Sequence, residues 1–304
     1  MARREHTQHN QIDRRKPKRP SAQIKYGIAA RDWELPVAVS VETEAQLAEV
    51  LKHDAVALVY LDEACFTDFV ALIQRVHAAG KQAGLRLRRI ERDFDANGRK
   101  AENSAELLSV LWKAACLPDA LLVRNLDEAM LLEDFFAAHP ELKARIRRNF
   151  DYTVYGYNQE AIQALVSLGA DGLTYPIELT YHECRKLKSE LPFELMVYGH
   201  LPMMVSANCI QRTSARCDHG NRILQLRDRM GKDMPVRCYC TYCYNQIFNA
   251  EPLVLYDLPD EVRALQPQCL RYDFSVEPAA VVRQVLDGAV PRSMTRGHFR
   301  HGIE

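Results

Sequence analysis

Residues 55–90 read AVALVYLDEACFTDFVALIQRVHAAGKQAGLRLRRI, and this stretch decides the expected fold. Two short apolar runs, 55–62 and 83–90, have the length and composition of buried strands. Between them, residues 69–81 repeat apolar side chains at helical spacing. A strand, a helix and a second strand in this order are typical of a sheet whose strands lie parallel.

The same alternation continues in both directions along the chain. Further strand-like runs, each with a helical pattern after it, occur at 35–41, 120–126, 145–156, 172–179, 193–202 and 269–275. The pairs Thr43/Gln46 and Thr180/Glu183 have capping-box spacing, and Asn158 is an expected N-cap. Eight strand–helix units in series predict an α/β fold, a (β/α)8 TIM-like barrel. A doubly wound open sheet would give a similar pattern.

Length, composition and charge restrict the class of protein to which the chain belongs. A chain of 304 residues with 47% apolar and 26% charged residues suits a globular protein, and such a barrel forms one large domain. Forty basic and forty acidic residues give no general attraction to nucleic acid or membranes. Residues 1–20 carry seven Lys or Arg against two acidic residues. We therefore expect residues 1–25 to form a disordered basic tail or linker, or an RNA-contacting arm, before a barrel at 26–304.

The sequence lacks two features that would indicate a membrane-bound or secreted protein. No apolar run reaches the length of a membrane span, and the N-terminus lacks the apolar core of a signal peptide. We expect a cytoplasmic protein without a membrane partner, in which thiols stay reduced. The nine cysteines are also odd in number, so metal or redox chemistry is favoured over a disulfide framework.

The cysteines cluster in the one segment that breaks the strand–helix rhythm. Residues 203–268 separate the seventh and eighth expected strands, and a barrel places such an insertion at its functional mouth. Cys240 and Cys243 form a Cys-x-x-Cys pair, and Cys209 with Cys217 would complete four soft ligands. This set suits an iron–sulfur cluster, a structural zinc ion or redox thiols. Cys238 is a spare thiol.

Three further stretches carry a family resemblance. They are FELMVYGHLPMMVSANCIQ at 193–211, LQLRDRMGKDMPVRCYCTYCYNQIFNAEPL at 224–253 and TRGHFRHGIE at 295–304. Together they resemble the peptidase U-32 family, also called collagenase-like peptidases. The resemblance extends upstream through RIERD, LVRN, FDYTVYGYN and YPIELT.

The resemblance implies a barrel with a four-cysteine 4Fe-4S cluster, and Cys209, Cys217, Cys240 and Cys243 match its ligands. Better-understood relatives are oxygen-independent hydroxylases of tRNA or rRNA bases, or of the ring of ubiquinone precursors, with prephenate as oxygen donor. Long members carry two barrels. This chain resembles the C-terminal one, so the alternatives are a fragment of a longer protein, a split subunit with a second barrel as its partner, or a standalone relative.

Polar residues at the expected strand ends are candidates for holding a substrate. Guanidinium groups can hold a carboxylate-bearing donor. The candidates are Arg89, Arg92, Arg124 and Asn125 after strands three and four, and Asn158. Alternatively, these side chains are solvated or ion-paired at the barrel rim. For Asn158, the alternative role is the N-cap of the following helix.

Candidates for catalysis follow the sixth and seventh strands. Glu178 is a candidate acid, base or orienting carboxylate, with an ordinary surface glutamate as the alternative. Tyr198 and His200 end the seventh strand just before the cysteines. His200 could donate a proton, hold substrate or make a structural hydrogen bond to the rim.

The sequence offers little chemistry for proteolysis. It contains neither Gly-x-Ser-x-Gly nor His-Glu-x-x-His, and no lone nucleophile can be named. We expect an iron–sulfur protein that supports oxygen-independent hydroxylation of an RNA base or a small aromatic ring. A collagenase-like hydrolase of unknown mechanism and a non-catalytic partner barrel are the alternatives.

Overall fold

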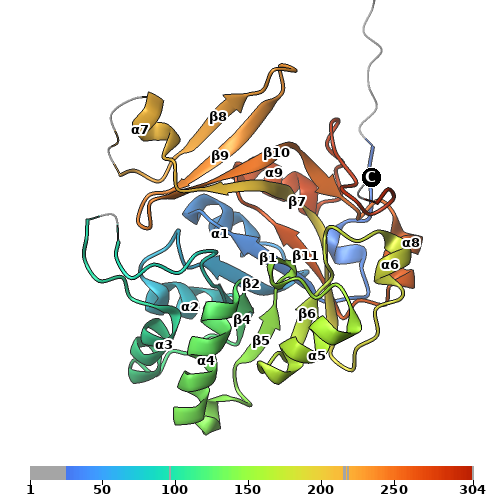
Figure 1. Ribbon diagram of the computed structural model, residues 1–304. Coiled ribbons are helices and arrows are strands. Elements are labelled where there is room, and N and C mark those ends of the chain that lie inside the picture. Colours follow the sequence, from blue (N-terminus) through green and yellow to red (C-terminus); the bar gives the residue numbers. More distant parts are fainter. Residues whose placement is uncertain (1–24, 96, 215–216, 218, 303–304) are drawn as a thin grey trace, which may run out of the picture.

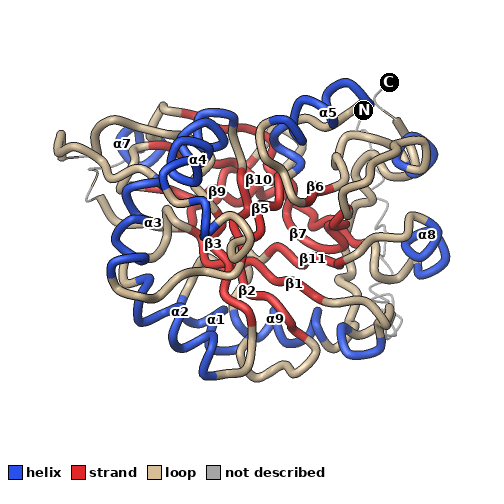
Figure 2. The backbone as a smooth tube through the Cα atoms, turned by 90° about the horizontal axis from the view of Figure 1, so that it is seen from below, coloured by secondary structure: helices blue, strands red, loops and turns tan. Residues whose placement is uncertain are grey.

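The computed structural model describes residues 25–95, 97–214, 217 and 219–302. Nearly all of the expected basic tail, 1–25, lies outside these residues. Within them, eight parallel strands close into a barrel, because the last strand pairs with both the first and the seventh. Figure 2 shows the strands at the centre with helices around them. The closed ring confirms the TIM-like barrel and excludes the open sheet.

The strands of the ring follow chain order. They are β1 (Val37–Val41), β2 (Val56–Asp62), β3 (Gln82–Arg86), β4 (Ala120–Val123), β5 (Arg147–Phe150), β6 (Gly172–Thr174), β7 (Phe193–Ser206) and β11 (Cys269–Asp273). The helices are α1 (Glu44–Val50), α2 (Phe69–Ala78), α3 (Ser104–Lys113), α4 (Leu126–Ala138), α5 (Gln159–Ser167), α6 (Tyr181–Cys184), α7 (Ile210–Ser214), α8 (Pro259–Ala264) and α9 (Ala279–Leu286). Short 3₁₀ turns are η1 (Ala30–Asp32), η2 (Pro140–Leu142) and η3 (Tyr152–Val154).

Alternate residues of each strand face opposite sides of the ring. The outward side chains, such as Val39 and Leu61, pack against the helices in the main core. A smaller apolar cluster of Ala38, Leu58, Tyr60, Ala120 and Leu122 fills part of the interior. Both expected capping boxes are present at α1 and α6, and Asn158 caps α5.

The insertion between β7 and β11 forms a second, antiparallel layer. The seventh strand is 14 residues long, and its C-terminal part pairs with β10 (Tyr244–Val254). β10 pairs with β9 (Asp233–Tyr239), and β9 pairs with β8 (Ile223–Arg227). We call β8, β9, β10 and residues 198–206 of β7 the mouth sheet. Figure 1 shows its orange strands above the barrel.

Five of the expected strands, β3, β4, β5, β6 and β11, end earlier in the structure, and β3 and β6 are two examples. β3 stops at Arg86 instead of continuing to residue 90, and β6 contains only Gly172–Thr174. Pro176 explains the second difference, because proline cannot donate a ladder hydrogen bond. Among the helices that the structure describes, none combines the length and apolar character needed to cross a membrane.

Candidate functional site at the barrel mouth

The Cys-x-x-Cys pair lies in the hairpin turn that joins β9 to β10. Tyr239 pairs with Tyr244, so Cys240 and Cys243 both belong to the turn between them. Cys243 adopts a left-handed backbone conformation with φ of 53°, and its N–H donates to the Cys240 carbonyl. This tight turn brings the two thiols to the same end of the mouth sheet.

The other clustered cysteines lie beside this turn. The Cys240 amide donates to Asn221 Oδ1 at 2.7 Å, which holds the segment after Cys217 against the turn. Asn245 of β10 donates to the Asn208 carbonyl at 2.9 Å, which holds the residue before Cys209 there. Residues far apart in sequence therefore converge on one corner of the sheet.

The pKa shifts of two thiols indicate that the clustered cysteines interact electrostatically. Burial, followed by the nearby thiols of Cys238, Cys217, Cys209 and Cys243, raises the pKa of Cys240 to about 12. Burial, with Cys209 and Cys217, likewise raises the pKa of Cys238. The spare Cys238 thus belongs to the same cluster as the four expected ligands.

The chemistry of the cluster suits a soft metal or an iron–sulfur cluster, because thiolates are the ligands that such groups prefer. The arrangement of the thiols does not by itself define a metal site. Across residues 25–95, 97–214, 217 and 219–302, no three His, Cys, Asp or Glu side chains are arranged to hold a metal ion. The thiols are gathered, but they do not surround a common point.

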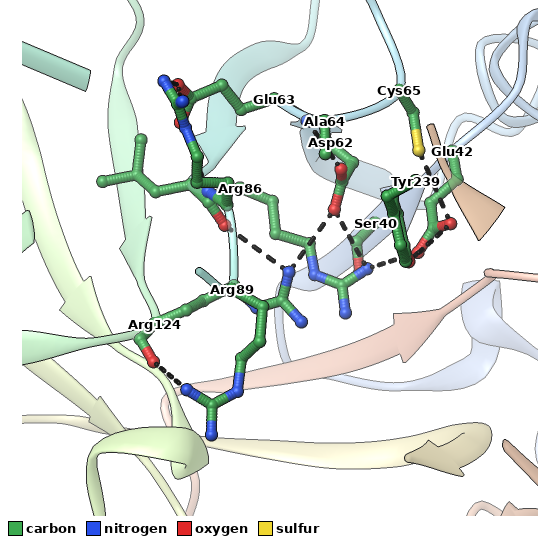
Figure 3. A network of polar contacts seen from close by, with 12 residues as sticks. Ser40, Glu42, Asp62, Glu63, Ala64, Cys65, Arg86, Arg89, Arg124 and Tyr239 are labelled. Atoms are coloured by element: carbon green, nitrogen blue, oxygen red, sulfur yellow. Dashed lines mark hydrogen bonds and ion pairs between the residues drawn. The ribbon is translucent and has the colours of Figure 1, made fainter. Parts of the chain in front are cut away.

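Buried polar contacts fasten the mouth sheet to the end of β1. The Tyr239 hydroxyl lies 3.0 and 3.1 Å from the two carboxylate oxygens of Glu42. Arg237 Nε is 3.1 Å from Glu42 Oε2, and Arg237 Nη2 donates to the Glu42 carbonyl at 2.8 Å. Figure 3 shows the Glu42 carboxylate beside Tyr239, Arg86 and Cys65. The cysteine-bearing sheet therefore covers the mouth directly.

A network of buried ion pairs fills the barrel below Glu42. Arg271 of β11 binds Asp151, which follows β5, and Glu194 of β7, both at 2.6 Å. Since β11 and β5 are not neighbours in the ring, the first contact crosses the interior. Arg124 is 3.5 Å from Asp62 and 3.8 Å from Asp151. Burial favours the neutral form of Asp151, but Arg271 and Arg124 outweigh it and lower its pKa.

Glu42 is the carboxylate that joins this network to the mouth sheet. Arg86 Nη1 lies 3.0 Å from Glu42 Oε1, whereas Arg237 Nε contacts Oε2. Burial raises the pKa of Glu42 to about 7; Arg237 and Arg86 oppose this shift, and Asp62 adds to it. The connection between barrel and sheet therefore includes a carboxyl group that titrates near neutral pH.

Beside the network, the mouth has a pocket of about 320 Å³. Its wall contains Arg89 and Glu178, which the sequence proposed as site residues, together with Tyr152, Tyr155 and the exposed Met203. Arg89 Nη1 donates to the Arg124 carbonyl at 3.3 Å, the one hydrogen bond of its side chain within the described residues. The remaining guanidinium donors can serve a ligand.

Tyrosines give the pocket an aromatic side. Tyr155 is exposed and holds a left-handed conformation with φ of 62°, which is uncommon for a residue other than glycine. Its ring packs edge-on against Tyr157 with a centroid distance of 5.6 Å. The Tyr157 hydroxyl donates to Glu178, so Glu178 is already engaged. The pocket combines ring faces, a cation and a carboxylate.

The other predicted binding residues lie elsewhere. Arg92 lines a separate open groove, and its buried Nε has no hydrogen-bond partner in the described structure. Asn125 caps α4 and donates to the Arg88 carbonyl, and Asn158 caps α5. Arg124 is 1% exposed within the ion-pair network. Of these candidates, only Arg89 reaches the pocket.

The two candidates on β7 do not line the pocket. Tyr198 is 1% exposed and packs with Tyr256, Tyr272 and Phe274 in the outer core. His200 Nδ1 is 2.7 Å from the Asn249 carbonyl, which is the structural hydrogen bond considered from the sequence. This placement favours structural roles for both side chains.

Sequence reasoning missed the interior network and the tyrosines. The residues that it did not single out are Glu42, Asp62, Arg86, Asp151, Tyr155, Tyr157, Arg237, Tyr239, Arg271 and Asp273. A signal was present, because several strands end with charged side chains at every second position, as in LRLR at 85–88 and LRYD at 270–273. Such alternation indicates that one face of a buried strand is polar.

Comparisons with known proteins do not assign a family. No family model matches the sequence, and no curated protein matches it. Solved structures with a similar arrangement include the U32 peptidase Mk0906, at 9% identity and a TM-score of 0.46, over 86% of this chain and 99% of that one.

Spore cortex-lytic enzymes are also among the similar structures. SleL of Bacillus cereus is 8% identical over 86% of this chain and 76% of its own, with a TM-score of 0.39. SleL of Bacillus megaterium is 9% identical over 91% and 77%, also at 0.39. Similarity at this level does not establish an activity.

Proposed function

We propose that the protein binds an iron–sulfur cluster through Cys209, Cys217, Cys240 and Cys243. The observation that carries this proposal is the convergence of these thiols, with Cys238, at one corner of a sheet that covers the barrel mouth. Four thiolates would supply the ligands of a 4Fe-4S cluster. A bound cluster would supply electron-transfer chemistry beside the mouth.

The mouth pocket supports the second half of the proposal, an oxygen-independent hydroxylation of an RNA base. Tyr155 and Tyr157 offer ring faces of the kind on which bases stack, and Arg89 offers donors for an anionic group. The peptidase U-32 resemblance makes prephenate the expected oxygen donor. Neither a hydrolytic nucleophile nor a second barrel is needed for these binding roles.

Metal analysis tests the cluster. The protein is purified without oxygen, and iron, sulfide and zinc are measured together with the absorption near 400 nm. We expect roughly four irons and four sulfides per chain. The Cys240→Ala variant should lose them, whereas Cys184→Ala, which removes a buried thiol of α6, should keep them. One zinc without iron would contradict both the cluster and the hydroxylase.

Nucleoside analysis tests the reaction separately. Ribosomal and transfer RNA from cells with and without the protein are digested and compared by mass spectrometry. We expect a nucleoside that carries one additional oxygen atom only when the protein is present. An Arg89→Gln variant that keeps its iron should lower the yield of this nucleoside. If the nucleoside profile is unchanged although the protein carries its iron, the protein binds a cluster but does not hydroxylate RNA.

A further inference from the structure

A second cavity lies at the opposite end of the barrel from the mouth sheet. Its volume is about 370 Å³, within the usual range of small-molecule sites. The lining residues come from the starts of the strands, among them Leu58 of β2, Arg147 of β5, Glu194 of β7 and Cys269 of β11. The cavity therefore opens at the N-terminal end of the ring.

The inner end of this cavity presents a carboxylate. Glu194 is 5% exposed, and its Oε1 receives Arg271 at 2.6 Å and the Asn149 amide at 3.4 Å. No hydrogen bond to its second oxygen, Oε2, is present within the described residues. A ligand group that donates hydrogen bonds can therefore bind Glu194 without displacing Arg271.

Tyr60 lies near Glu194 but does not line the cavity. The side chain is completely buried, and its ring covers Gly84 of the neighbouring strand. A ligand in the cavity therefore does not contact the Tyr60 hydroxyl, and the ligand contacts come from the lining residues alone.

The outer end of the cavity presents a cation. Arg147 is exposed at the rim, and no ion pair of its side chain occurs among the residues that the structure describes. It acts electrostatically on Glu194, yet the two groups are not within ion-pair distance. Opposite charges thus face each other across an open space, and Leu58 and Phe193 supply apolar walls.

We propose that this cavity binds a free amino acid, with its ammonium group on Glu194 and its carboxylate on Arg147. The side chain of the amino acid would pack on Leu58 and Phe193. A simple amine would leave Arg147 unused, and a simple carboxylate would leave Glu194 unpaired. The site is separate from the mouth and does not depend on the proposed cluster.

Equilibrium dialysis of the full chain against a mixture of the twenty protein amino acids tests this proposal. Retained amino acids are identified by mass spectrometry, and the best is measured by calorimetric titration. We expect at least one to be retained. Its decarboxylated amine and its deaminated acid should each bind at least about tenfold more weakly, because each loses one charged contact. Retention of no amino acid would overturn the proposal.

Matched variants locate the site. Arg147→Gln should weaken binding about tenfold, whereas Arg145→Gln, an exposed arginine two residues earlier that does not line the cavity, should not. Tyr60→Phe and Tyr272→Phe remove buried hydroxyls of residues that do not line the cavity, and both should leave binding unchanged. Equal effects of the two arginine variants would contradict the assignment.

Discussion

Several residues at strand and helix ends have a clear structural role that competes with a functional one. Asn158 is the plainest case, because its side-chain oxygen accepts the Ala161 amide at 2.8 Å and caps α5. Asn125 caps α4 in the same way. A polar residue that follows a barrel strand can therefore cap the next helix just as well as it can bind a substrate.

The cap at Asn158 can be tested directly. Asn158→Ala should lower the free energy of unfolding by about 1 kcal/mol, because the amide that Asn158 accepts loses its partner. Asn158→Asp keeps an acceptor and should cost much less. Urea unfolding of the three proteins measures the difference. If both variants are equally stable but bind RNA more weakly, Asn158 acts in binding instead.

Glu42 predicts a dependence of stability on pH. Its pKa in the folded protein is about 7, above its ordinary value of 4.5. The folded state therefore retains a proton that the unfolded chain releases. The stabilisation is complete below pH 4.5 and is lost as the pH rises through 7, with a slope of up to about 1.4 kcal/mol per pH unit.

The Glu42→Gln variant should remove this contribution, so its stability should change less between these pH values. Glu44→Gln, on the exposed side of α1, serves as the control. Denaturant unfolding at a series of pH values gives the comparison. Identical profiles for Glu42→Gln and the unchanged protein would contradict the assigned shift.

Among the elements, the turn between β9 and β10 combines the cysteine pair with an aromatic contact to the barrel. The Arg88 guanidinium lies 4.3 Å from the centre of the Tyr242 ring, and Arg88 is itself bound to Glu63 at 3.0 Å. Tyr242 lies between Cys240 and Cys243 in sequence. The cation–π contact therefore positions the turn that carries both thiols.

Removing the Tyr242 ring should loosen this turn. Tyr242→Ala should lower the free energy of local opening by about 1 to 2 kcal/mol, since a partly desolvated cation–π contact is lost. Tyr242→Phe retains the ring and should change little. Amide hydrogen exchange of residues 239–244 gives a readout that is independent of any bound metal. Equal exchange in both variants would show that Arg88 does not hold the turn.

The elements of the barrel could be predicted from the sequence because their signals are local. Apolar runs and capping pairs lie within a few residues of one another, as at Thr43 and Gln46. The mouth sheet could not be predicted in this way. β8 alternates exposed and half-buried residues, and the residues that flank it in the chain are polar. Its formation therefore depends on pairing with β9.

The candidate site shows the same limit. The clustered cysteines mark its position in the sequence, and the spacing of Cys240 and Cys243 predicts a shared turn. Nothing local indicates that Glu42, almost two hundred residues earlier, meets Arg237 and Tyr239. Such contacts arise only when the ring closes and brings the end of β1 under the sheet.

At the scale of the whole molecule, the interior of the barrel is held by charge as well as by apolar packing. Arg271 is fully buried and joins Glu194, Asp151 and Asp273, which belong to different strands or strand ends. A buried ion pair adds little stability compared with an apolar pair of the same shape, but removal of one partner is costly.

Arg271→Met should therefore lower the free energy of unfolding by about 3 to 5 kcal/mol, because Asp151 and Glu194 lose a buried partner. Arg283→Met, on the exposed surface of α9, should change it by less than about 0.5 kcal/mol. Guanidinium unfolding compares the two. A loss no larger than that of the control would mean that the network relaxes or admits water when Arg271 is removed.

The long β7 strand has a consequence for the order of assembly. It belongs to the ring and to the mouth sheet at once, while β11, which closes the ring, comes after the whole insertion in the chain. During synthesis, the seven earlier ring strands and all of β8–β10 leave the ribosome before β11 does. The cysteine-bearing layer can thus pair with an open sheet, and the barrel is completed beneath it as the last ring strand arrives.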